Sequence, residues 1–255
     1  MKRYSFPLVA LTLAGLPLLS AAQNATLSAA TKPAVLIELF TSEGCSSCPP
    51  ADSLLAELDQ RKSYNGVPVV VLSEHVDYWD HDGWRDPYSS ADWTARQNNY
   101  NYRFHLESVY TPQMVIDGSQ QVSGGDPAKI AHVLETASAQ SGKINIAIQN
   151  AAWSGDVLHA TVEISQTDAK GANLYAVLAD DSDTSNVGKG ENSGKTLTHV
   201  AVVRALHKVG KLQGPYNGEI QISLPKGVQH SKMRLIVFAQ KGDNGQVFGA
   251  AETTV

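Results

Sequence analysis

Residues Glu38-Leu-Phe-Thr-Ser-Glu-Gly-Cys45-Ser-Ser-Cys48-Pro-Pro-Ala-Asp52 hold both cysteines of the chain, spaced as Cys-x-x-Cys. The apolar run over residues 34–40 before them is typical of a buried strand, and residues 53–58 after them have helical spacing. Pro49 and Pro50 have no N–H to donate, so we expect the helix to begin near residues 47–49. The N-terminus of a helix stabilises a thiolate. The pattern therefore predicts a reactive, exposed Cys45, with Cys48 about one turn away to resolve a mixed disulfide.

Three interpretations of the cysteine pair are open: a redox-active pair, a metal site or an inert structural disulfide. A disulfide between residues only three apart closes a very small loop. Such a bridge removes little chain entropy from the unfolded state, so it would stabilise the fold poorly. We therefore favour the redox-active pair.

The N-terminus has the features of a secretory signal peptide over residues 1–22. Lys2 and Arg3 precede an apolar run over residues 6–19, and Ser20-Ala21-Ala22 is a small-residue cleavage site. A membrane anchor is the alternative, but the run is too short to span a bilayer comfortably. We expect an exported protein, periplasmic or secreted, with a mobile lead-in over residues 23–33. Its net charge of -5 argues against nucleic acid or an anionic membrane as the main partner.

The apolar period changes at Ser141-Gly142. Before it, a second buried strand at residues 67–73 predicts a parallel strand–helix–strand unit with the first strand, and Asp126-Pro127 begins another helix. Residues 78–110 between them are rich in aromatic side chains. After it, about seven segments with a period of two predict a sandwich of strands. We expect a domain boundary there.

Other polar residues are candidates for chemistry. Glu38 lies in the first apolar strand and could relay a proton to the second thiol, or it could reach water at the strand end. His75, Asp77, His81 and Asp82 follow the second strand and could bind copper or zinc with the cysteines, or form a structural polar loop. Residues 188–196 imitate a phosphate-binding loop, but Lys189 stands where its first glycine belongs.

The first motif resembles the thioredoxin superfamily, and more closely a family of exported bacterial thioredoxin-like proteins catalogued as a domain of unknown function. The remaining matching motifs are His75-Val-Asp-Tyr-Trp79, Arg96-Gln97, Tyr110-Thr-Pro-Gln113, Asp117-Gly118, Gly190-Glu-Asn192 and Val202-Val-Arg204. The resemblance implies an α/β fold, with a thioredoxin-like domain at residues 34–141 and a β-sandwich-like domain at residues 142–255. It also implies that Cys45 attacks, that Cys48 resolves, and that Pro112 is a cis-proline.

We accordingly expect a thiol–disulfide oxidoreductase-like protein that needs no cofactor. Its clients would be disulfides or thiols of proteins or small molecules. The backbone of Thr111 would pair with an extended client, and Tyr110 and Trp79 would contact it. Two alternatives stay open: a copper- or zinc-binding protein that uses Cys45, Cys48 and His75, and a non-enzymatic adaptor that binds through its β domain. No sequence feature indicates the oligomeric state.

Overall fold

The computed structural model describes residues 1–2, 32–81, 83–140, 142–166, 168–229 and 232–255. The expected signal peptide and lead-in therefore lie largely outside the described residues. Within these ranges, no helix is both long enough and apolar enough to cross a membrane. Residues Lys32–Val255 form one compact unit.

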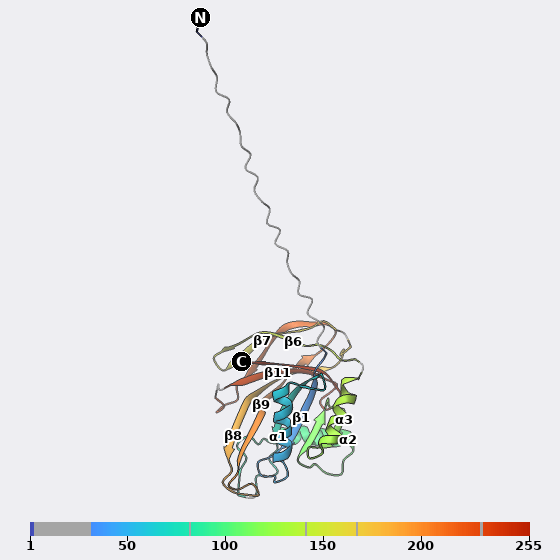
Figure 1. Ribbon diagram of the computed structural model, residues 1–255, viewed down its shortest axis with the longest axis vertical. Coiled ribbons are helices and arrows are strands. Elements are labelled where there is room, and N and C mark those ends of the chain that lie inside the picture. The colour runs from blue at the N-terminus through green and yellow to red at the C-terminus, as the bar shows by residue number, and fades with distance from the viewer. Residues whose placement is uncertain (3–31, 82, 141, 167, 230–231) are drawn as a thin grey trace. The chain divides into compact units, whose positions relative to one another are not determined.

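The first half of this unit alternates strands and helices, as expected (Figure 1). Its elements are β1 (Val35–Thr41), α1 (Pro49–Arg61), β2 (Ser63–Tyr64), β3 (Val67–His75), α2 (Ala91–Phe104), β4 (Gln113–Ile116), β5 (Gln120–Ser123) and α3 (Pro127–Ser138). Two sequence features fix the starts of helices: two prolines occupy the first turn of α1, and the Ser90 side chain caps α2 by accepting from the main-chain N–H of Asp92. β1 and β3 are parallel neighbours, and α1 connects them. The predicted strand–helix–strand unit is confirmed.

Among the described residues of the second half there are seven strands, the number expected. They are β6 (Ala147–Ser154), β7 (Val157–Ile164), β8 (Asn173–Asn186), β9 (Thr196–Lys211), β10 (Tyr216–Ser223), β11 (Met233–Gln240) and β12 (Val247–Thr254). Four of them extend the sheet of the first half, in the order β12-β11-β8-β9-β3-β1-β4-β5, and β2 pairs with β3 to complete nine strands. The other three form a separate sheet in the order β10-β7-β6.

The fold is thus a mixed α/β arrangement with one large sheet and few helices, and the expected division at residues 141–142 does not match it. One sheet holds strands from both sides of that boundary, so a self-contained sandwich over residues 142–255 is wrong. The reason lies in β8 and β11, which are buried on both faces. Tyr175, Val177 and Phe238 pack into the core shared with β1 and β3, whereas Leu174 and Val237 pack beneath the three-stranded sheet. A strand that is apolar on both faces needs covering on both.

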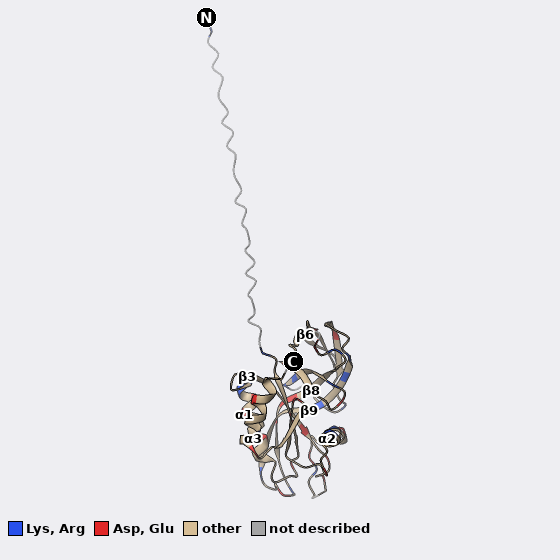
Figure 2. Cartoon of the chain, turned by 90° about the vertical axis from the view of Figure 1, so that its right-hand side faces the viewer, with Lys and Arg blue, Asp and Glu red and all other residues tan. Residues whose placement is uncertain are grey.

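The helices cover opposite faces of the large sheet. In the view of Figure 2, α1 and α3 lie on one side of the strands and α2 lies on the other. Apolar side chains of α1 and α3 join the core with β1 and β3, among them Leu55, Leu58, Ile130 and Leu134. On the side of α2, Tyr100 packs with Phe40, Val76 and Val115.

A buried ion cluster links α2 to three strands. The Arg96 Nε lies 2.7 Å from Glu38 Oε1 on β1 and 3.3 Å from Glu74 Oε1 on β3. Tyr100 donates to the same Glu38 carboxylate, and Gln240 on β11 donates to the Tyr100 hydroxyl over 2.7 Å. Burial and the nearby Glu38 carboxylate raise the pKa of Glu74 well above its ordinary value. One guanidinium therefore lies against two buried carboxyl groups, and it only partly offsets the desolvation of Glu74.

Replacing Arg96 with methionine should strongly destabilise the fold, because Glu38 and Glu74 would stay buried without a cation. Removing one partner of a buried ion pair costs about 3–5 kcal/mol. The control is Arg103→Met on the same helix, where an exposed side chain donates over 2.9 Å to the Gly118 carbonyl and should cost about 1 kcal/mol. The free energy of unfolding in urea measures both. Equal losses would show that the cluster does not hold the elements together.

Candidate functional site

Cys45 and Cys48 form a disulfide at the N-terminus of α1. The main-chain N–H of Cys45 donates to Ser42 O over 3.1 Å, and that of Cys48 donates to Cys45 O over 3.2 Å, so the motif is a tight turn that leads into the helix. Both cysteines are fully buried, although Ser46 and Ser47 between them are exposed. The expected exposure of Cys45 is therefore wrong. Sequence spacing places the residue at the helix tip, but tertiary packing covers it.

Trp79, Thr111 and Pro112 come together beside this turn. A Cβ on Gly44 would lie 3.0 Å from both the Cβ and the carbonyl oxygen of Trp79, so the glycine allows the Trp79 main chain to approach the turn closely. The Trp79 Nε1 donates to Thr111 Oγ1 over 2.8 Å. The Thr111–Pro112 peptide bond is cis, as the resemblance implied.

Pro112 and Tyr110 sit at the two sides of Thr111. A Cβ on Gly124 would lie 2.7 Å from the Cβ of Ala51 and 3.0 Å from that of Pro112, which places Pro112 beside the first turn of α1. The Tyr110 hydroxyl instead donates to Gln121. The structure therefore brings Trp79, Thr111 and Pro112 to the disulfide turn, and it directs the Tyr110 hydroxyl toward β5.

The connection between β8 and β9, residues Val187–Lys195, holds the turn from the other half of the chain. We call it the hairpin tip. The Asn192 side chain donates from Nδ2 to the carbonyl oxygens of Glu43 and Cys45, over 2.8 and 2.9 Å. The Ser46 N–H donates to Glu191 Oε2 over 2.9 Å. The hairpin tip, whose sequence only imitates a phosphate-binding loop, thus binds the main chain of the cysteine turn through two of its side chains.

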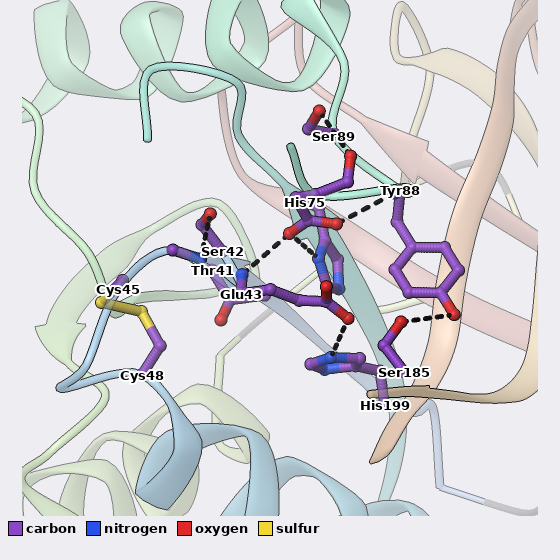
Figure 3. Close-up of polar contacts among 12 residues, drawn as sticks. Thr41, Ser42, Glu43, Cys45, Cys48, His75, Tyr88, Ser89, Ser185 and His199 are labelled. Carbon is purple, nitrogen blue, oxygen red and sulfur yellow. Dashed lines mark hydrogen bonds and ion pairs between the residues drawn. A yellow bond between two sulfur atoms is a disulfide. The ribbon is translucent and has the colours of Figure 1, made fainter. Parts of the chain in front are cut away.

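Glu43 connects the turn to a buried cluster of ionisable side chains (Figure 3). Its Oε2 accepts from Trp84 Nε1 over 2.8 Å, and its Oε1 lies 3.3 Å from His199 Nε2. Its main-chain N–H donates over 2.8 Å to Asp86 Oδ2, which also lies 2.7 Å from His75 Nδ1. The rings of His75 and His199 meet edge to face, 4.5 Å between centroids.

Asp52 closes the cluster on the side of α1. Its Oδ1 accepts from Thr41 Oγ1 over 2.9 Å and lies 3.9 Å from His199 Nδ1. Burial raises the pKa of Asp52, although His199 nearby acts in the opposite direction. Because Asp52 follows Cys48 by four residues, the two side chains share one face of the helix start. A groove of ≈ 700 Å³ between α1 and the start of β9 includes Asp52 and His199 in its lining.

The His75–Asp86 pair is a buried ion pair. Burial alone would lower the pKa of His75, but the Asp86 carboxylate outweighs it and raises the pKa above the ordinary value. Burial would likewise raise the pKa of Asp86, and His75 brings it below its ordinary value instead. Both shifts favour the charged forms, so each group stabilises the other.

Two expectations about this site need correction. Glu38 does not serve the cysteines in this structure, because its carboxylate is taken up by Arg96 and Tyr100 in the ion cluster. The alternative metal site of Cys45, Cys48 and His75 does not form either, since the sulfurs are joined to each other and His75 pairs with Asp86. Across the described ranges, no group of three or more His, Cys, Asp or Glu side chains is arranged to hold a metal ion.

Sequence reasoning missed several residues of the site. His199 and Asp86 are distant in sequence from the cysteines, and a single sequence shows nothing that joins them to Glu43. Asn192 lies in the matching motif Gly190-Glu-Asn192, but the motif did not indicate what this residue does. Asp52 belongs to the first motif, and its position one turn after Cys48 was the available signal.

The buried ion pair predicts a pH-dependent contribution to stability. A histidine whose folded pKa is raised stabilises fully below its unfolded pKa of about 6.5, and this contribution is lost as the pH rises through the folded pKa. His75→Gln should therefore cost about 3 kcal/mol at pH 6 and less at pH 9. The control is His132→Gln on the exposed face of α3, where a surface substitution should cost little at either pH. Urea unfolding at both pH values checks this, and an equal loss from His75→Gln at both would contradict it.

Comparison with known proteins places the chain in a family without assigning an activity. It is similar to the X-ray structure of a protein from Agrobacterium tumefaciens, with a TM-score of 0.66 and 27% identity over 86% of this chain and 92% of that one. OgpA from Akkermansia muciniphila has a TM-score of 0.26 and 13% identity over 45% of this chain and 28% of its own. Spo0M, a sporulation control protein from Bacillus subtilis, has a TM-score of 0.26 and 10% identity over 44% of this chain and 47% of its own.

No curated protein matches the chain. The family model described as "Protein of unknown function (DUF1223)" matches residues 36–240, which is most of the chain. The chain belongs to this family of proteins of unknown function, DUF1223.

Proposed function

We propose that this protein is an exported thiol–disulfide oxidoreductase that exchanges a disulfide with thiol or disulfide clients through Cys45 and Cys48. The observation that carries the proposal is the Cys45–Cys48 disulfide at the start of α1, with Pro112 beside the same helical turn. The parallel β1–α1–β3 unit around it supports a thioredoxin-like assignment for the first half of the chain. The sequence pattern of residues 1–22 supports export.

The exchange takes place in two balanced steps. A client thiolate attacks the Cys45 sulfur, a mixed disulfide forms, and Cys48 leaves with the electron pair of the broken S–S bond. A second client thiolate then attacks the client sulfur of the mixed disulfide and expels Cys45. The client loses two electrons and becomes a disulfide, and the protein gains them as a dithiol. The reverse sequence reduces a client disulfide.

Nearby groups suit the two cysteines to different roles. The Ser47 hydroxyl lies 3.3 Å from the Cys45 sulfur and could donate to a thiolate there. Pro49 and Pro50 lack N–H groups, so the helix start offers fewer main-chain donors than a Cys-x-x-Cys motif alone suggests. Asp52, on the face of α1 that Cys48 shares, could exchange a proton with Cys48. In this proposal it takes the role that the sequence suggested for Glu38.

Client contacts belong to the surface formed by Trp79 and Thr111. Pro112, which follows Thr111, lies beside the first turn of α1, and the half-buried Trp79 is fixed by its hydrogen bond to the Thr111 hydroxyl. An extended client could pair with this segment as an added strand. Tyr110 would contact the client at the edge of this surface rather than over the disulfide, because its hydroxyl is directed toward Gln121.

A trapping experiment tests the function. In Cys48→Ala, Cys45 cannot be resolved and should accumulate a mixed disulfide with glutathione, read as a mass increase mapped to Cys45. Cys45→Ala is the matched control and should trap several-fold less at Cys48, because the Ser47 hydroxyl lies at the Cys45 sulfur and would stabilise a thiolate only there. Equal trapping, or none in either variant, would count against the proposal.

The Ser47 contact predicts the thiol pKa of Cys45 in the reduced protein. Ser47→Ala should raise that pKa by about one unit, since a hydrogen bond to a charged group is worth about 1.5–3 kcal/mol. Ser46→Ala is the control, because the Ser46 N–H and hydroxyl are both directed to Glu191 rather than to the Cys45 sulfur, and the main-chain contact is retained. The pH dependence of Cys45 alkylation measures the shift. Identical profiles for both variants would remove Ser47 from the mechanism.

A further inference from the structure

The cysteine turn is held by side chains that lie far from it in sequence. Asn192 donates to the carbonyl oxygens of Glu43 and Cys45, on the two sides of Gly44, and is itself buried. Lys195 Nζ donates to Asn192 Oδ1 over 2.9 Å, which orients the carboxamide so that its N–H groups face the turn. These contacts tie the hairpin tip to the main chain on the N-terminal side of the disulfide.

The sulfur atoms cannot be reached while the turn keeps this conformation. Cys45 and Cys48 have 0% of their surface exposed. A nucleophile must approach a disulfide along the S–S axis, so exchange requires the turn to move. Two side chains of the hairpin tip oppose such a movement. Asn192 holds the carbonyl groups of Glu43 and Cys45, and Glu191 holds the Ser46 N–H.

We infer that the hairpin tip acts as a gate on the disulfide, with Asn192 as the positioning residue that keeps it closed. The inference rests on the proposed exchange at Cys45 and Cys48, and it adds how clients gain access. Reduction then proceeds through a local opening in which Asn192 releases the turn. When opening and closing are fast, the observed rate follows the population of the open form. Weakening the contacts of Asn192 with the turn should therefore raise the rate without changing the chemistry at sulfur.

The test is the rate of disulfide reduction by dithiothreitol in the folded protein, with thiols trapped by maleimide and counted by mass. Asn192→Ala should be reduced at least fivefold faster than the wild type, the ratio expected when two hydrogen bonds of ordinary net strength are lost. Asn192→Asp keeps the side-chain size but cannot donate, so it should show the same increase and covers the case in which alanine fails to fold. Lys195→Met should give a smaller increase.

Ser193→Ala is the matched control. Ser193 lies next to Asn192, but its hydroxyl donates to Gly188 O inside the hairpin tip and does not touch the turn. The rate of disulfide reduction in Ser193→Ala should stay within twofold of that in the wild type. The accelerated rates should also be independent of urea below the unfolding transition, because a local opening exposes little surface.

Three results would overturn the gate in different ways. If the wild type is reduced readily and Asn192→Ala and Asn192→Asp are no faster, the proposed function stands and the gate is wrong. If an acceleration grows steeply with urea, the variants react through global unfolding and the gate is also wrong. If neither the wild type nor the variants are reduced while folded, both the gate and the proposed function fail.

Discussion

The site depends on the hydrogen bonds from one carboxamide to the main chain of the cysteine turn. Asn192 stands 149 and 147 residues from Glu43 and Cys45, yet it satisfies the carbonyl oxygens of both. Buried main-chain acceptors need partners, and a turn that ends at two prolines has few of its own. The β8–β9 connection supplies them. The large sheet makes this possible, since β9 lies beside β3 and brings its hairpin tip back to the loop that follows β1.

The interior between the two halves is ionic as well as apolar. Arg96 joins Glu38 and Glu74 on one side of the sheet, while the cluster of Glu43, His75 and Asp86 lies behind the disulfide. Such groups are costly to bury, and each cluster reduces that cost by placing opposite charges next to each other. The first cluster joins α2 to the strands. The second, through Glu43, joins the disulfide turn to β3 and β9, so the geometry at sulfur depends on residues in both halves of the chain.

Local features of the sequence predicted what is local in the structure. Apolar runs predicted β1 and β3, the two prolines predicted the start of α1, and alternation predicted seven later strands. A period of two indicates that a segment is a strand, but it does not indicate which strand lies beside it. The predicted sandwich of residues 142–255 was therefore wrong, because four of the later strands join the sheet of the first half. The pairing of Glu38 with Arg96 and the approach of His199 to Asp52 escaped for the same reason. Both are contacts with α2 and β9 that a spacing within one segment cannot encode.

The central claim is that Cys45 and Cys48 interconvert between disulfide and dithiol while the protein stays folded. Equilibration in dithiothreitol redox buffers, with the thiols counted by mass and the fold followed by circular dichroism, tests it most directly. The account predicts one two-electron transition, both cysteines changing together, with an unchanged far-ultraviolet spectrum in both forms. A disulfide that stays oxidised in every buffer until the spectrum shows unfolding would contradict it, and would make the bridge a structural part of the turn.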